Sequence, residues 1–128
     1  MKLLSIIKPV YAHCDLPCGV YDPAQAGIEA EAIYEILKKY EALGEHDKTR
    51  AIIIKEERAE LVKHHLMVLW ADYFKPEHIE KYPELHEMFW KAIRQASACK
   101  RHLDPEEGRK LVEQIDGIAK IFWETKQA

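Results

Sequence analysis

Hydrophobic positions recur at helical spacing in four stretches of the chain, and no stretch alternates strictly as a strand would. The first stretch follows Asp22 and Pro23, a capping residue and a proline that suits the first turn of a helix. We expect Gly44 to end this helix. Its predicted inner positions are Ile28, Ala32, Ile33, Ile36, Leu37, Tyr40 and Leu43.

The second helix is predicted to start near residues 47–49 and to stop before Pro76, followed by a short turn at 77–81. Its inner face is predicted to contain Ile54, Leu61, Val62, His65, Leu69 and Tyr73. The third helix begins near Pro83, with inner positions Leu85, Phe89, Ile93 and Ala96. The fourth follows residues 104–107, which combine a cap, a proline and two acids, and its stripe is Leu111, Ile115, Ile118 and Phe122.

Four helices joined by short loops predict an all-α protein, an up-down-up-down four-helix bundle that spans residues 22–128. A chain of 128 residues is long enough for one domain with a real hydrophobic core. Its formal net charge of -3 lacks the basic excess that nucleic-acid binders usually show. No segment approaches the roughly 20 apolar residues of a membrane span. We therefore expect neither a nucleic acid nor a membrane as a partner.

Residues 1–12 form a separate segment, the leader, which we expect to be removed on maturation. Its apolar run, Leu3 to Ile7, is shorter than the roughly 7–15 residues of a secretion signal. The leader is therefore predicted to be a short processed segment of a cytoplasmic protein rather than an export signal.

Residues 13–21, here called the hook, bring one imidazole and two thiols close together in His13, Cys14 and Cys18. Pro17 and Gly19 favour a bend around them. Spacing alone leaves zinc, copper and nickel open, together with a local disulfide or two spectator thiols. Cleavage after Ala12 would add a terminal amine, and two nitrogens with two thiolates in one plane suit square-planar Ni(II). Cys99 stands alone on a later helix and is predicted to be a small buried residue.

The hook and the residues after it, His13-Cys14-Asp15-Leu16-Pro17-Cys18-Gly19-Val20-Tyr21-Asp22-Pro23, resemble the nickel-binding segment of the nickel superoxide dismutases. The resemblance continues to the C-terminus through residues 54–61, 63–65, 69–70, 72–76, 82–86 and 120–126. It implies an antioxidant enzyme that converts superoxide into oxygen and hydrogen peroxide while nickel alternates between Ni(II) and Ni(III). It also implies a homohexamer and a maturation protease that cuts after Ala12.

The resemblance also implies a ligand set and a role for several side chains. The nickel ligands are the thiolates of Cys14 and Cys18, the Cys14 amide nitrogen, the His13 amine and, in the oxidised state, the His13 imidazole. The Leu16–Pro17 bond is expected to be cis, and Asp15 to fix the hook. Tyr21 is expected beside the open face of the nickel, with Tyr73 hydrogen-bonded to it. His13 and Tyr21 are thus the predicted catalytic residues.

Glu29 and Arg58 match the pair that orients the His13 imidazole in this family. Charges on core-facing stripes need partners in any case, so an ordinary interhelix salt bridge, or a pair of charges that reach solvent, is the simpler alternative. Lys63 and Lys75 are expected to attract the superoxide anion. Such a local field would matter because loss of Lys2 and Lys8 with the leader takes the net charge from -3 to -5.

Two other readings of the chain remain at this point. One is a bundle that binds nickel or copper without catalysis, and the other is a structural bundle whose two hook cysteines form a disulfide. A second metal site is not predicted, because no convincing ligand set is found among the remaining histidines considered: His64, His65, His78, His86 and His102.

Overall fold

A computed structural model describes residues 19–127, so the leader and the hook residues up to Cys18 lie outside the described part. The elements are α1 (Ala24–Lys39), η2 (Tyr40–Ala42), α2 (Glu45–Val68), η3 (Leu69–Tyr73), α3 (Pro76–Lys81), α4 (Leu85–Arg101) and α5 (Pro105–Gln127). All are helical; η2 is a 3₁₀ turn and η3 a π-helical turn.

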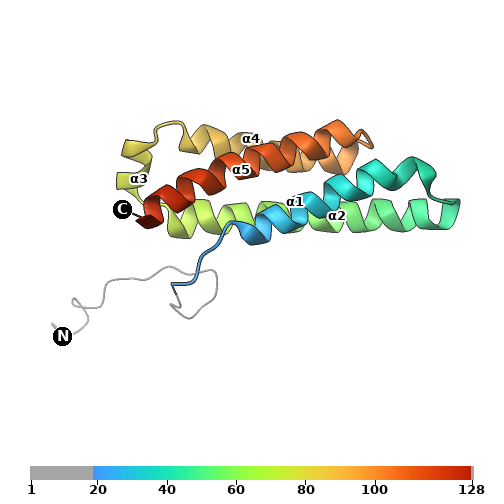
Figure 1. Ribbon diagram of the computed structural model, residues 1–128, viewed down its shortest axis with the longest axis horizontal. Helices are drawn as coiled ribbons and strands as arrows, with labels where there is room; N and C mark the ends of the chain where they lie inside the picture. The colour runs from blue at the N-terminus through green and yellow to red at the C-terminus, as the bar shows by residue number, and fades with distance from the viewer. Residues whose placement is uncertain (1–18, 128) are drawn as a thin grey trace.

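The four long helices run alternately in opposite directions, as Figure 1 shows. Each packs on its two neighbours, in the cyclic order α1, α2, α4 and α5. This arrangement confirms the predicted up-down-up-down bundle. The start of the described chain, η3, α3 and the end of α5 gather at one end of the molecule, here called the hook end (Figure 1).

The core is a continuous cluster of apolar side chains contributed by all four long helices. The predicted stripe of α5 is confirmed, since Leu111, Ile115, Ile118 and Phe122 are all buried. In α4 the predicted stripe holds at Leu85, Phe89 and Ala96, whereas Ile93 is only partly buried. Small side chains complete the core and let the helices approach closely: Ala26, Ala30, Ala59, Ala92 and Ala96.

The predicted inner faces of the first two helices were partly wrong. Ile28 is 66% exposed and Leu61 is 37% exposed, while the buried positions of α2 include Ala51, Ala59 and Lys55. The predicted positions Val62 and Leu69 are confirmed, because both are buried. Between Ala51 and Ala59, alanines and one lysine occupy the inside of α2, so a pattern read from large side chains misses the core face there.

The predicted helix boundaries also needed corrections. Gly44 does not end α1 in a left-handed conformation; with φ of -72° it is the N-cap of α2, after the 3₁₀ turn η2. Residues 77–81, predicted to be a turn, belong to the helix α3, which Pro76 begins. The start signals at Asp22 and Asp104 are confirmed, because their carboxylate oxygens accept hydrogen bonds from the Ala24 and Glu106 backbone N–H groups at 2.8 and 2.9 Å.

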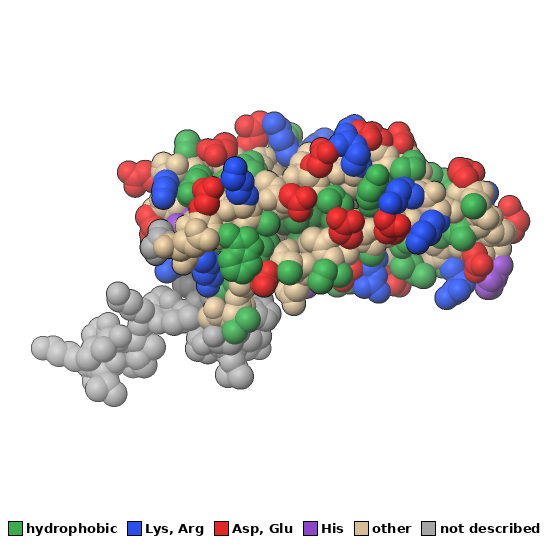
Figure 2. Space-filling model, viewed as in Figure 1, with side chains coloured by type: hydrophobic (Ala, Val, Ile, Leu, Met, Phe, Trp, Pro, Cys, Tyr) green, Lys and Arg blue, Asp and Glu red, His purple; other side chains and the backbone are tan. Residues whose placement is uncertain are grey.

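The outer surface of the bundle carries acids and bases mixed together, as the face in Figure 2 shows. On this face basic side chains alternate with acidic ones rather than forming a continuous basic region. Among residues 19–127 no helix is both long and apolar enough to cross a membrane.

Candidate metal centre

The described chain begins at the hook end with Gly19, whose φ of +68° is the left-handed conformation that glycine adopts without strain. Tyr21 follows, and its ring packs on Tyr73 with centroids 5.5 Å apart. The Tyr21 side chain is partly buried and packs on the core cluster. The start of the described chain is thus held against η3 through Tyr21.

Tyr73 occupies the last position of η3, the π-helical turn that extends α2. The Phe74 N–H donates to the Leu69 carbonyl oxygen at 3.0 Å, a bond that spans five residues. The Tyr73 ring packs on Phe122 at 4.4 Å and stacks on His78 at 5.8 Å. Aromatic contacts therefore hold this ring on several sides.

The Tyr73 hydroxyl lies 2.7 Å from Thr125 Oγ1. The sequence predicted a hydrogen bond between Tyr73 and Tyr21; the structure assigns the Tyr73 hydroxyl to Thr125 and records a ring contact with Tyr21. The ammonium group of Lys126 lies 5.3 Å from the centre of the Tyr73 ring. Sequence reasoning missed both Thr125 and Lys126, because a polar last turn is ordinary for a surface helix.

Glu29 and Arg58 form the predicted ion pair between α1 and α2. Both carboxylate oxygens of Glu29 accept from Arg58 Nη1, at 3.2 and 3.0 Å. The Glu29 side chain is 15% exposed and that of Arg58 is 39% exposed. The pair is therefore half-buried, with the carboxylate on the inside and part of the guanidinium accessible to further partners.

The two lysines predicted to steer the substrate differ in position. Lys63 Nζ lies 3.8 Å from Glu60 on the same face of α2, so an acid partly offsets its charge. Lys75 is exposed and lies two residues after Tyr73. Lys75 and Lys126 therefore place positive charge at the hook end, whereas the charge of Lys63 is partly balanced within α2.

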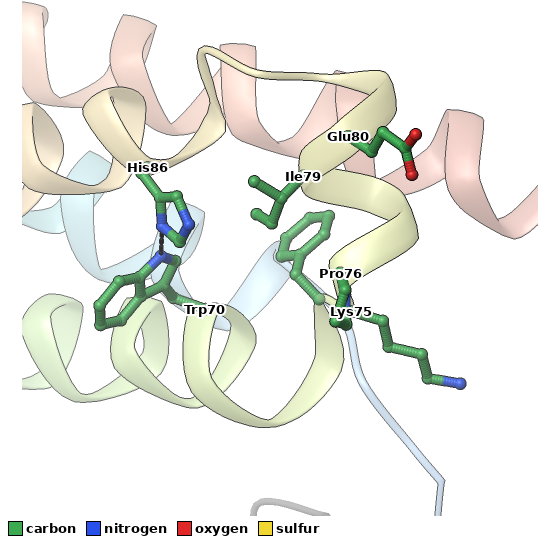
Figure 3. A pocket seen from close by; sticks show the side chains of 7 residues that line it. Trp70, Lys75, Pro76, Ile79, Glu80 and His86 are labelled. Carbon is green, nitrogen blue, oxygen red and sulfur yellow. Dashed lines mark hydrogen bonds between the residues drawn. The ribbon is translucent and has the colours of Figure 1, made fainter.

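A shallow groove lies between η3, α3 and the start of α4, lined by Trp70, Phe74, Lys75, Pro76, Ile79, Glu80 and His86. Trp70 Nε1 donates to His86 Nδ1 at 2.8 Å, which ties η3 to α4. Figure 3 shows Lys75 and Glu80 reaching away from the apolar centre of this groove. The charged ends of Lys75 and Glu80 thus do not converge on the groove. The clearest contribution of the groove to the site is the hydrogen bond from Trp70 to His86, which holds η3 against α4.

The predicted metal ligands His13, Cys14 and Cys18, and Asp15 beside them, lie outside the described residues, as does the Leu16–Pro17 bond. Within residues 19–127 no three His, Cys, Asp or Glu side chains come together as a metal site. Cys99 is buried in the core, which raises the pKa of its thiol to about 12. The two thiols and the imidazole that the sequence offers in the hook stay the predicted donors for a soft metal ion.

A helical bundle whose sequence begins with a Cys/His segment is the organisation expected of a metalloprotein. The comparisons with known proteins give the family. The model of the nickel-containing superoxide dismutases matches residues 8–126, and the chain belongs to this family.

One curated relative, "Superoxide dismutase [Ni]" from Streptomyces seoulensis, is 58% identical over 128 residues and covers 99% of this chain and 98% of its own length. A native nickel superoxide dismutase solved at 1.30 Å is 56% identical, with a TM-score of 0.87, and covers 91% of this chain and 100% of its own. An apo structure is 54% identical, with a TM-score of 0.84, and covers 86% and 100% respectively. The all-helical bundle is thus shared with solved members of the family.

Proposed function

We propose that this chain, once its leader is removed, dismutates superoxide at a nickel ion held by the hook. Two superoxide anions and two protons give one molecule of oxygen and one of hydrogen peroxide. The observation that carries the proposal is the family match over residues 8–126, which includes the hook and the bundle that supports it. Membership in this family makes nickel the cofactor and superoxide the substrate.

The proposed ligands are the thiolates of Cys14 and Cys18, the Cys14 amide nitrogen, and the amine and imidazole of His13. Bound there, nickel supplies a one-electron couple between its divalent and trivalent states. The sequence provides this donor set within six residues, and an amine at His13 requires that the bond to Ala12 be cut. We propose that a maturation protease makes this cut in the cytoplasm.

The coverage of the solved structures supports a leader. Curated relatives match 99% of this chain, whereas the native solved chain is matched in full yet covers 91% of it. The uncovered share is about the size of residues 1–12.

The Glu29–Arg58 pair is proposed to orient the His13 imidazole. Arg58 is fixed by a carboxylate that is 15% exposed, while part of its own guanidinium stays accessible. A positioned partner beyond the ligand shell fixes the ring orientation of a metal-binding histidine. The pair would then act on the ring without becoming a ligand itself.

The aromatic end of the bundle is proposed to limit access to the hook. Tyr21 packs on Tyr73, and Phe122 and His78 hold the Tyr73 ring in turn. Small anions and water can pass such a barrier while larger reductants are kept out. Lys75 and Lys126, with a smaller contribution from Lys63, provide positive charge that attracts superoxide to an otherwise acidic protein.

Assembly into a homohexamer is part of the proposal. Several large apolar side chains are exposed on the single chain, among them Ile28, Met67, Trp90 and Trp123. Apolar surface of this kind is expected where subunits meet. Light scattering of the mature protein tests the number of chains directly.

The decisive experiment combines intact mass, metal content and activity on protein purified from its native cell. The proposal expects a chain that starts at His13, about one nickel per chain, and removal of superoxide. A Cys14→Ser, Cys18→Ser double variant should lose both nickel and activity, whereas Cys99→Ser should retain both. Cleaved and nickel-loaded protein without activity would instead indicate a metal carrier, and unloaded protein with a Cys14–Cys18 disulfide would indicate a structural bundle.

A further inference from the structure

The hydroxyl group of Thr125 lies between two oxygen atoms at the end of α5. Its Oγ1 donates to the Phe122 carbonyl oxygen at 2.6 Å and lies 2.7 Å from the Tyr73 hydroxyl. A threonine hydroxyl carries one proton, and a carbonyl oxygen can only accept. With that proton committed to Phe122, Thr125 can meet Tyr73 only as an acceptor. Tyr73 is therefore the donor in this pair.

The direction of this hydrogen bond determines how the Tyr73 oxygen can interact with other molecules. A phenol also carries one proton, so a Tyr73 that donates to Thr125 presents only lone pairs to anything else that approaches its oxygen. Such an oxygen accepts from water, from another hydroxyl or from hydrogen peroxide. It does not donate to a superoxide anion, which is itself an acceptor.

We propose that Thr125 is a positioning residue that fixes the Tyr73 phenol as a hydrogen-bond acceptor toward the hook. This inference rests on the proposed function, because it assigns Tyr73 to the surroundings of the nickel. In this arrangement Tyr73 holds donors such as water or the peroxide product and leaves the anion to the cations nearby. Thr125 acts only through Tyr73 and touches neither metal nor substrate.

The geometry around Thr125 suits this role. The bond to Phe122 spans three residues within α5, so it restrains the side-chain rotamer of Thr125. The ring of Tyr73 is held independently by Phe122 and His78. Loss of the threonine hydroxyl would therefore leave the ring in place. Only the phenol O–H group would change, because it would be able to donate to another acceptor.

The test is a double-mutant cycle with Thr125→Val, which removes the hydroxyl while keeping the shape of the side chain, and Tyr73→Phe. We expect Thr125→Val to lower kcat/KM for superoxide by about two- to tenfold, the range of one hydrogen bond. Thr125→Ser should restore it. In the Tyr73→Phe protein, Thr125→Val should have no further effect. Thr49→Val is the matched control, because Thr49 bonds to the Glu45 carbonyl oxygen on α2 at 3.2 Å, far along the chain from Tyr73.

A second measurement does not depend on activity. In metal-free full-length chain labelled with ¹³C at tyrosine Cζ, the Tyr73 resonance is identified by its absence in Tyr73→Phe. We expect it to shift in Thr125→Val, to return in Thr125→Ser, and to stay unchanged in Thr49→Val.

An unchanged resonance in Thr125→Val would overturn the proposal, as would an equal loss of activity in the Tyr73→Phe protein. The second result would mean that Thr125 acts through the fold alone. A wild-type protein that holds nickel but does not remove superoxide would instead refute the proposed function, and the resonance would then decide whether Thr125 accepts from Tyr73.

Discussion

The two ends of the bundle use polar groups in opposite ways. Where α4 turns into α5, the ammonium of Lys55 is 2% exposed and donates to three carbonyl oxygens, those of Cys99, Lys100 and His102, at 2.6, 2.8 and 3.0 Å. Its three N–H donors are all used. At the hook end, the Tyr73 oxygen keeps lone pairs for further partners. Arg58, three residues from Lys55 on α2, likewise keeps part of its guanidinium exposed. A saturated polar group stabilises the fold, whereas one with capacity left can act on a ligand.

Replacing the buried ammonium should have the largest effect on stability. Lys55→Met leaves the last carbonyl oxygens of α4 without their donor, since a helix end has no partners of its own for them. We expect the free energy of unfolding to fall by about 3 kcal/mol in urea titrations. Lys39→Met, at a side chain that is 72% exposed, serves as control and should leave the urea midpoint unchanged. Equal midpoints for the two variants would contradict the structural role of Lys55.

The close packing of α1 against the start of α5 gives the next largest expected effect on stability. A Cβ added to Gly108 would lie 2.8 Å from the Cα of Tyr34, so α1 and α5 would have to move apart. We expect Gly108→Ala to cost about 2 kcal/mol of stability. Gly117→Ala is the matched control on the same helix, because its Cβ would meet only the flexible end of Met88 at 3.3 Å. That variant should gain helix propensity and melt no lower than wild type.

For the half-buried Glu29–Arg58 pair, the expected effect falls on activity rather than on stability. Glu29→Gln keeps the shape of the side chain but removes the charge that fixes Arg58. We expect activity per nickel to fall about tenfold, as for other partners of metal ligands, with little change in thermal unfolding. Glu35→Gln is the control, since Glu35 forms an exposed pair with Lys38 on the same helix. A loss of stability that accounts for the lost activity would make the pair structural, as Lys55 is.

The smallest expected effect is the labelling of Cys99 by a thiol reagent. Burial raises the pKa of Cys99 to about 12, so at pH 8 almost none of it is the reactive thiolate. We expect a maleimide to label the hook cysteines of metal-free protein at pH 8 and to leave Cys99 unlabelled until urea unfolds the chain. Peptide mapping by mass spectrometry distinguishes the sites. Labelling of Cys99 in the native state would show that this end of the core opens more readily than its packing implies.

Sequence patterns predicted the bundle because helix starts and most core stripes are local signals. The cap and proline at residues 104–105 and the stripe of α5 needed nothing beyond neighbours in the chain. The inner face of α2 was predicted only in part, because burial around Lys55 depends on the neighbouring helices. Lys55 is buried only because the end of α4 supplies three carbonyl oxygens, and no pattern within α2 carries that information.

The candidate site also contains residues that the sequence could predict and a contact that it could not. Resemblance indicated Glu29 and Arg58, and the structure brings them together across two helices. The bond between Tyr73 and Thr125 joins residues 52 positions apart. Nothing in either local segment marks it, because it arises only where the ends of α2 and α5 meet.

The π-helical turn η3 has a consequence for how this end of the molecule tolerates change. An α-helix advances about 100° per residue, so one residue more or fewer rotates everything that follows. The five-residue bond from Phe74 to Leu69 takes up one extra residue before Tyr73. Deleting a single residue between 69 and 72 would then restore a regular helix and leave the phenol facing Tyr21 and Thr125, whereas a second deletion would rotate it away from both. The turn therefore lets this segment lose one residue while the tyrosine keeps its direction.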